Sequence, residues 1–148
     1  MKDMSAKTVT LGLEGTLTIA DIEAVAVGGA KVALADDARR ALGAFRAAAE
    51  KALGAALRDD PDRRVYGLNT GFGSNFKDYV SPEELKQLQR NLIISHCAGM
   101  GPLAPAPVVR ATMLLRAASL ARGHSMVRPV VVETLIDMLN AGVTPAVP

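Results

Sequence analysis

The sequence predicts a mainly α-helical fold with one or two short strands. Hydrophobic residues make up 49% of the 148 residues, but aromatic residues only 3%, so alanine, leucine and valine must supply the core. Alanine and leucine both favour helices. Apolar side chains also recur at helical spacing between N-cap residues and glycines, which is the pattern of amphipathic helices.

The beginning of the chain predicts a short strand and a helix. Residues 8–13 alternate between apolar and polar side chains, as a short edge strand does. The tetrapeptide T-I-A-D, which starts at Thr18, predicts an N-cap followed by an acidic residue in the first turn. That helix runs to about Val27 and ends at Gly28 and Gly29.

A long alanine-rich helix is expected next, from about Ala38 to Arg58. Its apolar side chains fall on one face. They are Leu42, Phe45, Ala49, Leu53 and Ala56. The charged segment D-D-P-D-R-R that follows, residues 59–64, predicts a turn.

Three more helices complete the expected fold. Ser81 predicts the start of the first, with Pro82 in its first turn and Glu84 completing a capping box. Glycines end it near Gly99. One face of this helix carries Leu85, Leu88, Leu92 and His96. The other two helices are expected at about 108–122 and 129–140, ended by Gly123 and Gly142. A second short strand or β-turn is expected near Tyr66.

Composition argues against several classes of function. The net charge of +2 is scattered, without a basic patch interleaved with aromatic residues, so we expect no nucleic-acid partner. The single cysteine, Cys97, excludes a disulfide within the chain and fits a reducing cytoplasm. The first residues lack the apolar region of a secretory signal, and no apolar run approaches the ~20 residues of a membrane helix. His96 and His124 lack the spacing of metal ligands, so we expect no metal.

The segment Val65–Gly73, V-Y-G-L-N-T-G-F-G, is the strongest functional signal. Its three glycines allow unusual backbone conformations, and the Asn69-Thr70 pair adds local side-chain hydrogen bonds that favour turns. Tyr66 stands at the mouth of this loop, so a catalytic loop or lid is one interpretation and a structural tyrosine the other. A phosphate cradle is disfavoured because G-x-G-x-x-G and a following Lys-Ser/Thr pair are absent.

The octapeptide Y-G-L-N-T-G-F-G resembles the inner active-site loop of the aromatic amino acid ammonia-lyases and aminomutases. Three further segments resemble that family in the same order and spacing. They are L-Q-R-N-L-I-I-S-H-C-A-G-M-G from Leu88, S-L-A-R-G-H-S from Ser119 and N-A-G-V-T-P-A-V-P from Asn140. The likeness runs from about Val9 to Pro148 and is nearest to the histidine ammonia-lyases.

The resemblance implies the helical fold of the aspartase and fumarase enzymes. Residues 1–148 would be a single N-terminal region of such a subunit, with the long bundle helices beyond Pro148. Within it, residues 1–64 would be a helical segment, residues 65–80 the tyrosine loop, and residues 81–148 the helices that lead to an electrophile loop.

The resemblance also implies a reaction: loss of ammonia from histidine or a related aromatic amino acid, with removal of a β-proton, to give an arylacrylate such as urocanate. Tyr66 matches the position of the family's base, and Gly67 that of a substrate contact. Gly71 and Gly73 would let the loop move over the substrate. Since tyrosine ordinarily has a pKa near ~10, such a base needs positive charge or hydrogen-bond donors nearby.

Ser95 and His96 match the family's selectivity position, where histidine ammonia-lyases contact the substrate ring. Phenylalanine-specific relatives tend to have Phe-Leu there and tyrosine-specific ones His-Leu, but some tyrosine aminomutases also carry Ser-His. Taken by itself, a histidine on a leucine-lined face is usually a core histidine. A Cys97–His96 nucleophile is disfavoured because neighbours in a helix point to different faces. The segment that contains Arg122 and His124 is interpreted as structural, and Arg116 and Arg128 receive no role.

The family's electrophile, a methylidene-imidazolone group, forms from an internal Ala-Ser-Gly, which this sequence lacks. The group is therefore expected on a downstream segment or a partner chain, and the isolated chain is expected to be inactive. Three explanations stay open: a subunit of a split enzyme, a fragment or truncation, and a non-catalytic helical interaction module. The helix expected around Val130 to Leu139 is apolar on most faces, which favours a partner, and relatives suggest a homotetramer or hetero-oligomer. A component of an aromatic amino acid 2,3-aminomutase would share every motif.

Overall fold

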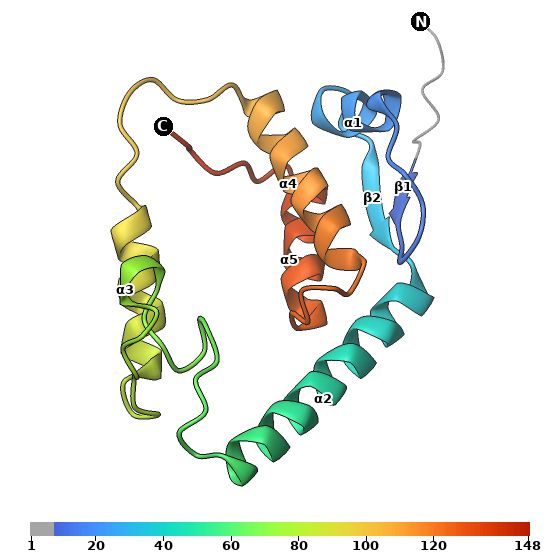
Figure 1. Ribbon diagram of the computed structural model, residues 1–148. Coiled ribbons are helices and arrows are strands. Elements are labelled where there is room, and N and C mark those ends of the chain that lie inside the picture. Colours follow the sequence, from blue (N-terminus) through green and yellow to red (C-terminus); the bar gives the residue numbers. More distant parts are fainter. Residues whose placement is uncertain (1–7) are drawn as a thin grey trace, which may run out of the picture. The chain divides into compact units, whose positions relative to one another are not determined.

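The computed structural model describes residues 8–148, which divide into two compact units. One unit consists of residues 8–51 and 102–148, and the other of residues 52–101. The described elements, in chain order, are β1 (Thr8–Leu11), α1 (Ile19–Ala26), β2 (Lys31–Leu34), α2 (Asp36–Asp59), α3 (Leu85–His96), α4 (Ala106–Ala121) and α5 (Pro129–Asn140) (Figure 1). A short 3-10 helix spans Gly73–Asn75. The predicted mainly α-helical fold is confirmed.

The first unit contains the hydrophobic core. β1 and β2 pair in parallel, with Val9 opposite Val32 and Leu11 opposite Leu34. α4 packs against α1, α5 and β1, while α5 also packs against β2 (Figure 1). The buried side chains come from all five of these elements and from the start of α2, where Ala38 and Leu42 have no exposed surface. The unit thus has one continuous apolar core, dominated by leucine, valine and alanine as the composition predicts.

An asparagine side chain occupies the outer edge of β2. Asn140, at the end of α5, accepts a hydrogen bond from the Val32 N–H through Oδ1 and donates one to the Val32 carbonyl through Nδ2, both at 2.8 Å. Its own carbonyl accepts from Lys31 Nζ at 2.8 Å. An unpaired strand edge must find partners for its N–H and C=O groups, and here one amide supplies both.

The ends of the helices largely follow the predicted caps. Thr18 and Asp21 form the predicted capping box: Thr18 Oγ1 accepts from the Asp21 N–H at 3.2 Å, and Asp21 Oδ2 accepts from the Thr18 N–H at 3.0 Å. Gly142 follows α5 with φ +72°, and the N–H of Val143 donates to the carbonyl of Met138 at 2.9 Å, which is the Schellman arrangement. These predictions are confirmed.

The prediction of a short strand or β-turn near Tyr66 is confirmed as a turn. That region forms turns and a single isolated antiparallel bridge between Thr70 and Tyr79. The second strand is instead β2, which the sequence analysis missed. β2 is only four residues long and its partner strand lies across a helical crossover, so neither a long run of strand-forming residues nor a hairpin turn marks it.

The predicted start of α3 at Ser81 is wrong. The helix begins at Leu85, after a turn in which the Glu84 N–H donates to the Ser81 carbonyl at 3.0 Å. The Ser81 hydroxyl donates to Glu84 Oε2 at 2.8 Å instead of accepting from the helix backbone. The pairing of these two side chains therefore closes a turn and does not cap the helix. The leucines of the predicted apolar face are half-buried, and His96 at its end is exposed.

Within residues 8–148, no helix combines the length and the apolar character that crossing a membrane requires.

We expect that Asn140→Ala destabilises the first unit, because it leaves both main-chain groups of Val32 without their partner. The expected loss is about 1–3 kcal/mol in the free energy of unfolding. Urea denaturation followed by circular dichroism measures it. Asn91→Ala, which removes an exposed amide on α3, is the matched control and is expected to change the free energy by less than about 0.5 kcal/mol. Equal effects of the two variants would contradict this account of the β2 edge.

Candidate active site

The candidate site is built on the glycine-rich loop of the second unit. A tight turn spans residues 65–68, closed by the Leu68 N–H donating to the Val65 carbonyl at 3.0 Å. Gly67 has φ +74°, the conformation that the third residue of a type II turn requires and that favours glycine. Tyr66 therefore stands at the corner of the turn, and its side chain is 65% exposed.

Two contacts hold the Tyr66 side chain. Its hydroxyl oxygen accepts a hydrogen bond from the Gly73 N–H at 3.4 Å. Its ring meets the Phe72 ring edge-on, with centroids 6.0 Å apart and planes inclined by 76°. The phenol is thus directed by its own loop while most of its surface stays open to a ligand.

Behind Tyr66, two buried polar residues organise the loop. Asn69 Oδ1 accepts from the Val65 N–H at 2.7 Å, and Nδ2 donates to the Arg63 carbonyl at 2.9 Å. Thr70 Oγ1 accepts from the Gly67 N–H at 3.2 Å and donates to the Gly71 carbonyl at 3.0 Å. The sequence predicts that this Asn-Thr pair bonds locally and favours turns, and the hydrogen bonds confirm it.

The two ends of the loop are joined by main-chain contacts. The Gly71 N–H donates to the Asp78 carbonyl at 3.0 Å, and the Val80 N–H donates to the Asn69 carbonyl at 3.0 Å. The Arg64 guanidinium donates to the Lys77 carbonyl. The loop is therefore closed on itself.

The glycines have different structural roles. The N–H groups of Gly67, Gly71 and Gly73 are bound to Thr70, Asp78 and Tyr66, so none is left to cradle a phosphate. A Cβ on Gly71 would lie 2.5 Å from the Asn75 carbonyl oxygen, so this position has no room for a side chain. Gly73 faces open space but has φ +58°. The mobility assigned to Gly71 and Gly73 stays a prediction.

Ser95 and His96 lie in the last turn of α3, and both are exposed. The His96 Nδ1 and the Ser95 hydroxyl each donate to the Leu92 carbonyl at 2.8 Å. Because a carbonyl only accepts, Nδ1 carries a hydrogen, and in the neutral ring Nε2 is then an acceptor. The alternative interpretation of His96 as a core histidine is wrong, since this residue is exposed. Its ring bonds go to Leu92 and Ser95 and not to Cys97, so the structure forms no Cys-His nucleophile.

The loop and α3 meet through Gln89, whose Nε2 donates to the Gly67 carbonyl at 3.4 Å. His96 lies two helical turns beyond this contact, about 10 Å further along the axis. The second unit therefore holds every residue that the sequence analysis assigned to the site: Tyr66, Gly67, Gly71, Gly73, Ser95 and His96.

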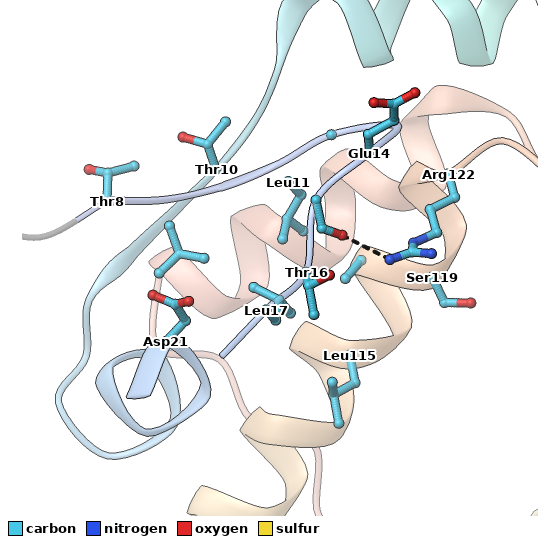
Figure 2. A pocket seen from close by; sticks show the side chains of 14 residues that line it. Thr8, Thr10, Leu11, Glu14, Thr16, Leu17, Asp21, Leu115, Ser119 and Arg122 are labelled. Carbon is cyan, nitrogen blue, oxygen red and sulfur yellow. Dashed lines mark hydrogen bonds between the residues drawn. The ribbon is translucent and has the colours of Figure 1, made fainter. Parts of the chain in front are cut away.

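The first unit contains a separate pocket of about 590 Å³ that sequence reasoning missed. Figure 2 shows it between the β1 strand, the loop that follows it, and α4. Arg122 reaches across from α4 and donates to the Gly15 carbonyl at 2.8 Å, which agrees with the structural role expected for its segment. The lining comes from segments far apart in the sequence, so no local motif marks the pocket. In the part of the chain that the structure describes, no group of three or more His, Cys, Asp or Glu side chains is arranged to hold a metal.

Comparison with known proteins identifies the family. The family model described as aromatic amino acid lyase matches residues 17–148. The chain belongs to the aromatic amino acid lyase family. The resemblance in the four sequence segments is thereby confirmed.

Three relatives show the extent of the similarity. A histidine ammonia-lyase of Streptomyces avermitilis is 46% identical over 140 residues, which are 95% of this chain and 26% of the relative. A tyrosine ammonia-lyase of Cupriavidus metallidurans is 54% identical over 84 residues, 57% of this chain and 16% of the relative. The crystal structure of a tyrosine aminomutase from Streptomyces globisporus superposes with a TM-score of 0.83 at 35% identity, over 96% of this chain and 26% of that one. The chain thus has the ammonia-lyase and aminomutase fold, and spans about a quarter of the length of the histidine ammonia-lyase and of the tyrosine aminomutase.

We expect that Gly71→Ala disrupts the loop, because the new methyl group meets the Asn75 carbonyl. The expected cost is about 1–3 kcal/mol of local stability, seen as faster amide hydrogen exchange at Gly71 and Val80. Gly43→Ala is the matched control: nothing lies within 4 Å of its Cβ. Because Gly43 lies within α2, we expect that change to stabilise the helix by about 0.5–1 kcal/mol. Normal exchange at both loop amides in Gly71→Ala would show that the loop tolerates a side chain there.

Proposed function

We propose that this chain is the tyrosine-loop component of an ammonia-lyase that eliminates ammonia from histidine or a related aromatic amino acid. The product would be an arylacrylate, urocanate in the case of histidine. The observation that carries the proposal is the exposed phenol of Tyr66, presented at the corner of a turn within a chain of the aromatic amino acid lyase family.

Tyr66 would remove the β-proton of the substrate. A general base has to come within about 3 Å of the proton that it takes. The Gly73 N–H fixes one direction of approach to the phenol oxygen, and the exposure of Tyr66 leaves the other side open to a substrate. Gly67, which adjoins Tyr66 in the turn, would lie beside the bound substrate, and movement about Gly71 and Gly73 would close the loop over it.

His96 would contact the aromatic ring of the substrate, with Ser95 beside it. With Nδ1 bound to Leu92, neutral His96 offers Nε2 as an acceptor, which suits the N–H of an imidazole or the hydroxyl of a phenol. This acceptor supports histidine as the substrate and is compatible with tyrosine. Relatives of both specificities are similar to the chain.

The family's electrophile has to come from other residues. Residues 1–148 contain no Ala-Ser-Gly, so the sequence given cannot form a methylidene-imidazolone group. When bound at the site, that group would supply the electrophile that activates the amino group of the substrate. We assign it to a downstream segment or a partner chain, and expect the isolated residues 1–148 to be inactive.

Exposed apolar surface supports such a partner. α4 and α5 form an apolar groove of about 630 Å³, lined by Leu120, Val130, Val131 and Leu135 and bordered by Arg116 and Arg128. In the second unit, Ile93 and Ile94 of α3 are 66% and 60% exposed. Apolar surfaces of this kind are usually covered by further polypeptide. We therefore propose that the chain works within a larger assembly, a homotetramer or a hetero-oligomer. The single cysteine supports the cytoplasm as its location.

An aminomutase component is the alternative enzyme, favoured by the similarity to the tyrosine aminomutase structure. It would use the same removal of the β-proton, but would then add the amino group to the β-carbon and a proton to the α-carbon of the arylacrylate. Product analysis separates the two, since a β-amino acid forms only in the aminomutase reaction. A non-catalytic helical module, by contrast, would form neither product.

We expect that Tyr66→Phe strongly lowers turnover, because the variant keeps the ring but has no oxygen to take the proton. The assay supplies the downstream part of the Streptomyces avermitilis relative, joined to residues 1–148 or coexpressed with them, and follows arylacrylate absorbance with histidine, tyrosine and phenylalanine. The expected loss in kcat is about 100-fold or more, the usual contribution of a general base.

The matched control for this assay is Tyr79→Phe, which removes the hydroxyl of the chain's other tyrosine. It is expected to leave kcat within about threefold of the parent, as for a residue outside the chemistry. If Tyr66→Phe stays as active as Tyr79→Phe, the base is another group.

Substitution of His96, the proposed contact to the substrate ring, tests the substrate specificity. His96→Leu removes the acceptor that would bind the imidazole, and the loss of one hydrogen bond predicts about a tenfold fall in kcat/KM for histidine. The kcat/KM for phenylalanine should stay the same or rise. Equal falls for both substrates would refute a role of His96 in selectivity.

A further inference from the structure

We propose that Asn69 is a positioning residue that sets the orientation of Tyr66 for proton removal. Its amide would do so by binding the main chain on the N-terminal side of Tyr66 with both its donor and its acceptor. This inference rests on the proposed function of Tyr66 as the base.

Asn69 is bound at four points. Its Oδ1 accepts from the Val65 N–H at 2.7 Å, and its Nδ2 donates to the Arg63 carbonyl at 2.9 Å. Its own N–H donates to the Val65 carbonyl at 3.2 Å, and its carbonyl accepts from the Val80 N–H at 3.0 Å. One residue thus joins the chain that enters the turn to the chain that leaves the loop.

The Asn69 Oδ1 bond to the Val65 N–H fixes the peptide that joins Arg64 to Val65. The Asn69 N–H fixes the Val65 carbonyl, which belongs to the peptide immediately before Tyr66. On the other side, the buried Thr70 hydroxyl accepts from the Gly67 N–H, the peptide immediately after Tyr66. The backbone of Tyr66 is therefore held on both sides by buried residues, Asn69 before it and Thr70 after it, and the direction of its Cα–Cβ bond depends on them. Proton removal depends on that direction, because a displacement of about 1 Å can cost a factor of ~100 in rate.

Only an asparagine at this position satisfies both partners. Asn69 is 7% exposed, so water cannot readily replace its bonds. An aspartate would accept from Val65 but, when ionised, has nothing to donate to the Arg63 carbonyl, and alanine offers neither bond. Hydrophobic side chains of residues 52–101 are at most half-buried, so packing holds the turn only weakly if the amide is lost.

The first test measures amide hydrogen exchange in the whole chain. Asn69→Ala is expected to speed exchange of the Val65 amide by about tenfold or more, because the acceptor of its N–H is gone. Asn69→Asp keeps that acceptor and is expected to retain most of the protection at Val65. Asn91→Ala removes an exposed amide from the same unit and is expected to leave Val65 unchanged. Unchanged exchange at Val65 in Asn69→Ala overturns the proposal.

The second test is a double-mutant cycle in the assay with the downstream polypeptide. Asn69→Ala is expected to lower kcat by about 10–100-fold while KM changes by less than about threefold. In the Tyr66→Phe background the same change should lower the residual rate by less than about threefold, since Asn69 acts through the tyrosine oxygen. An equal loss in both backgrounds would mean that Asn69 only stabilises the fold.

The two proposals fail in different ways. Full activity of Tyr66→Phe refutes the assignment of the base, whatever Asn69 does. With that assignment intact, normal exchange at Val65 or an additive double-mutant cycle refutes the role of Asn69. Partial recovery of kcat in Asn69→Asp, in line with recovered protection at Val65, supports it.

Discussion

Hydrogen bonds from buried polar side chains to the main chain hold the part of this protein that carries its candidate chemistry. In residues 52–101 no hydrophobic side chain is buried, while Asn69 and Thr70 are 7% and 1% exposed. Apolar burial usually dominates folding, but in these residues the apolar side chains are at most half-buried, so directional bonds carry much of the order of the loop. The main chain on both sides of Tyr66 is held by that network.

Asparagine is used in the same way in both units. Asn140 satisfies the N–H and C=O of Val32 at the edge of β2, and Asn69 satisfies an N–H and a C=O beside Tyr66. The side-chain amide has the same donor and acceptor as a peptide, so it can complete a backbone that no strand or helix pairs. In the first unit this finishes a sheet above a hydrophobic core. In the second unit, the asparagine amide holds a loop that has no fully buried hydrophobic side chain.

How well the sequence predicts the fold depends on how local each interaction is. The capping box of Thr18 and Asp21 lies within four residues, and the glycine that ends α5 follows it directly, so both were predictable. β2 was not, because its partners are β1 and Asn140, one across a helix and the other 108 residues away. The predicted start of α3 was wrong for a different reason. Ser81 and Glu84 can cap a helix or bond to each other, and the sequence alone does not distinguish these outcomes.

In the candidate site, too, the sequence predicts some features and misses others. A motif identifies Tyr66 and the Ser95-His96 pair, but the partners of Asn69 are main-chain groups, which every residue possesses and no motif records.

Hydrogen bonds to the main chain also affect how easily the loop moves. Each contributes only about 0.5–1.5 kcal/mol net, so a loop held by a few of them is ordered at rest yet opens at modest cost. An apolar core would hold the tyrosine more firmly, but it would have to be broken each time the loop moved. A polar network thus reconciles a directed phenol with the mobile loop that the proposed reaction requires.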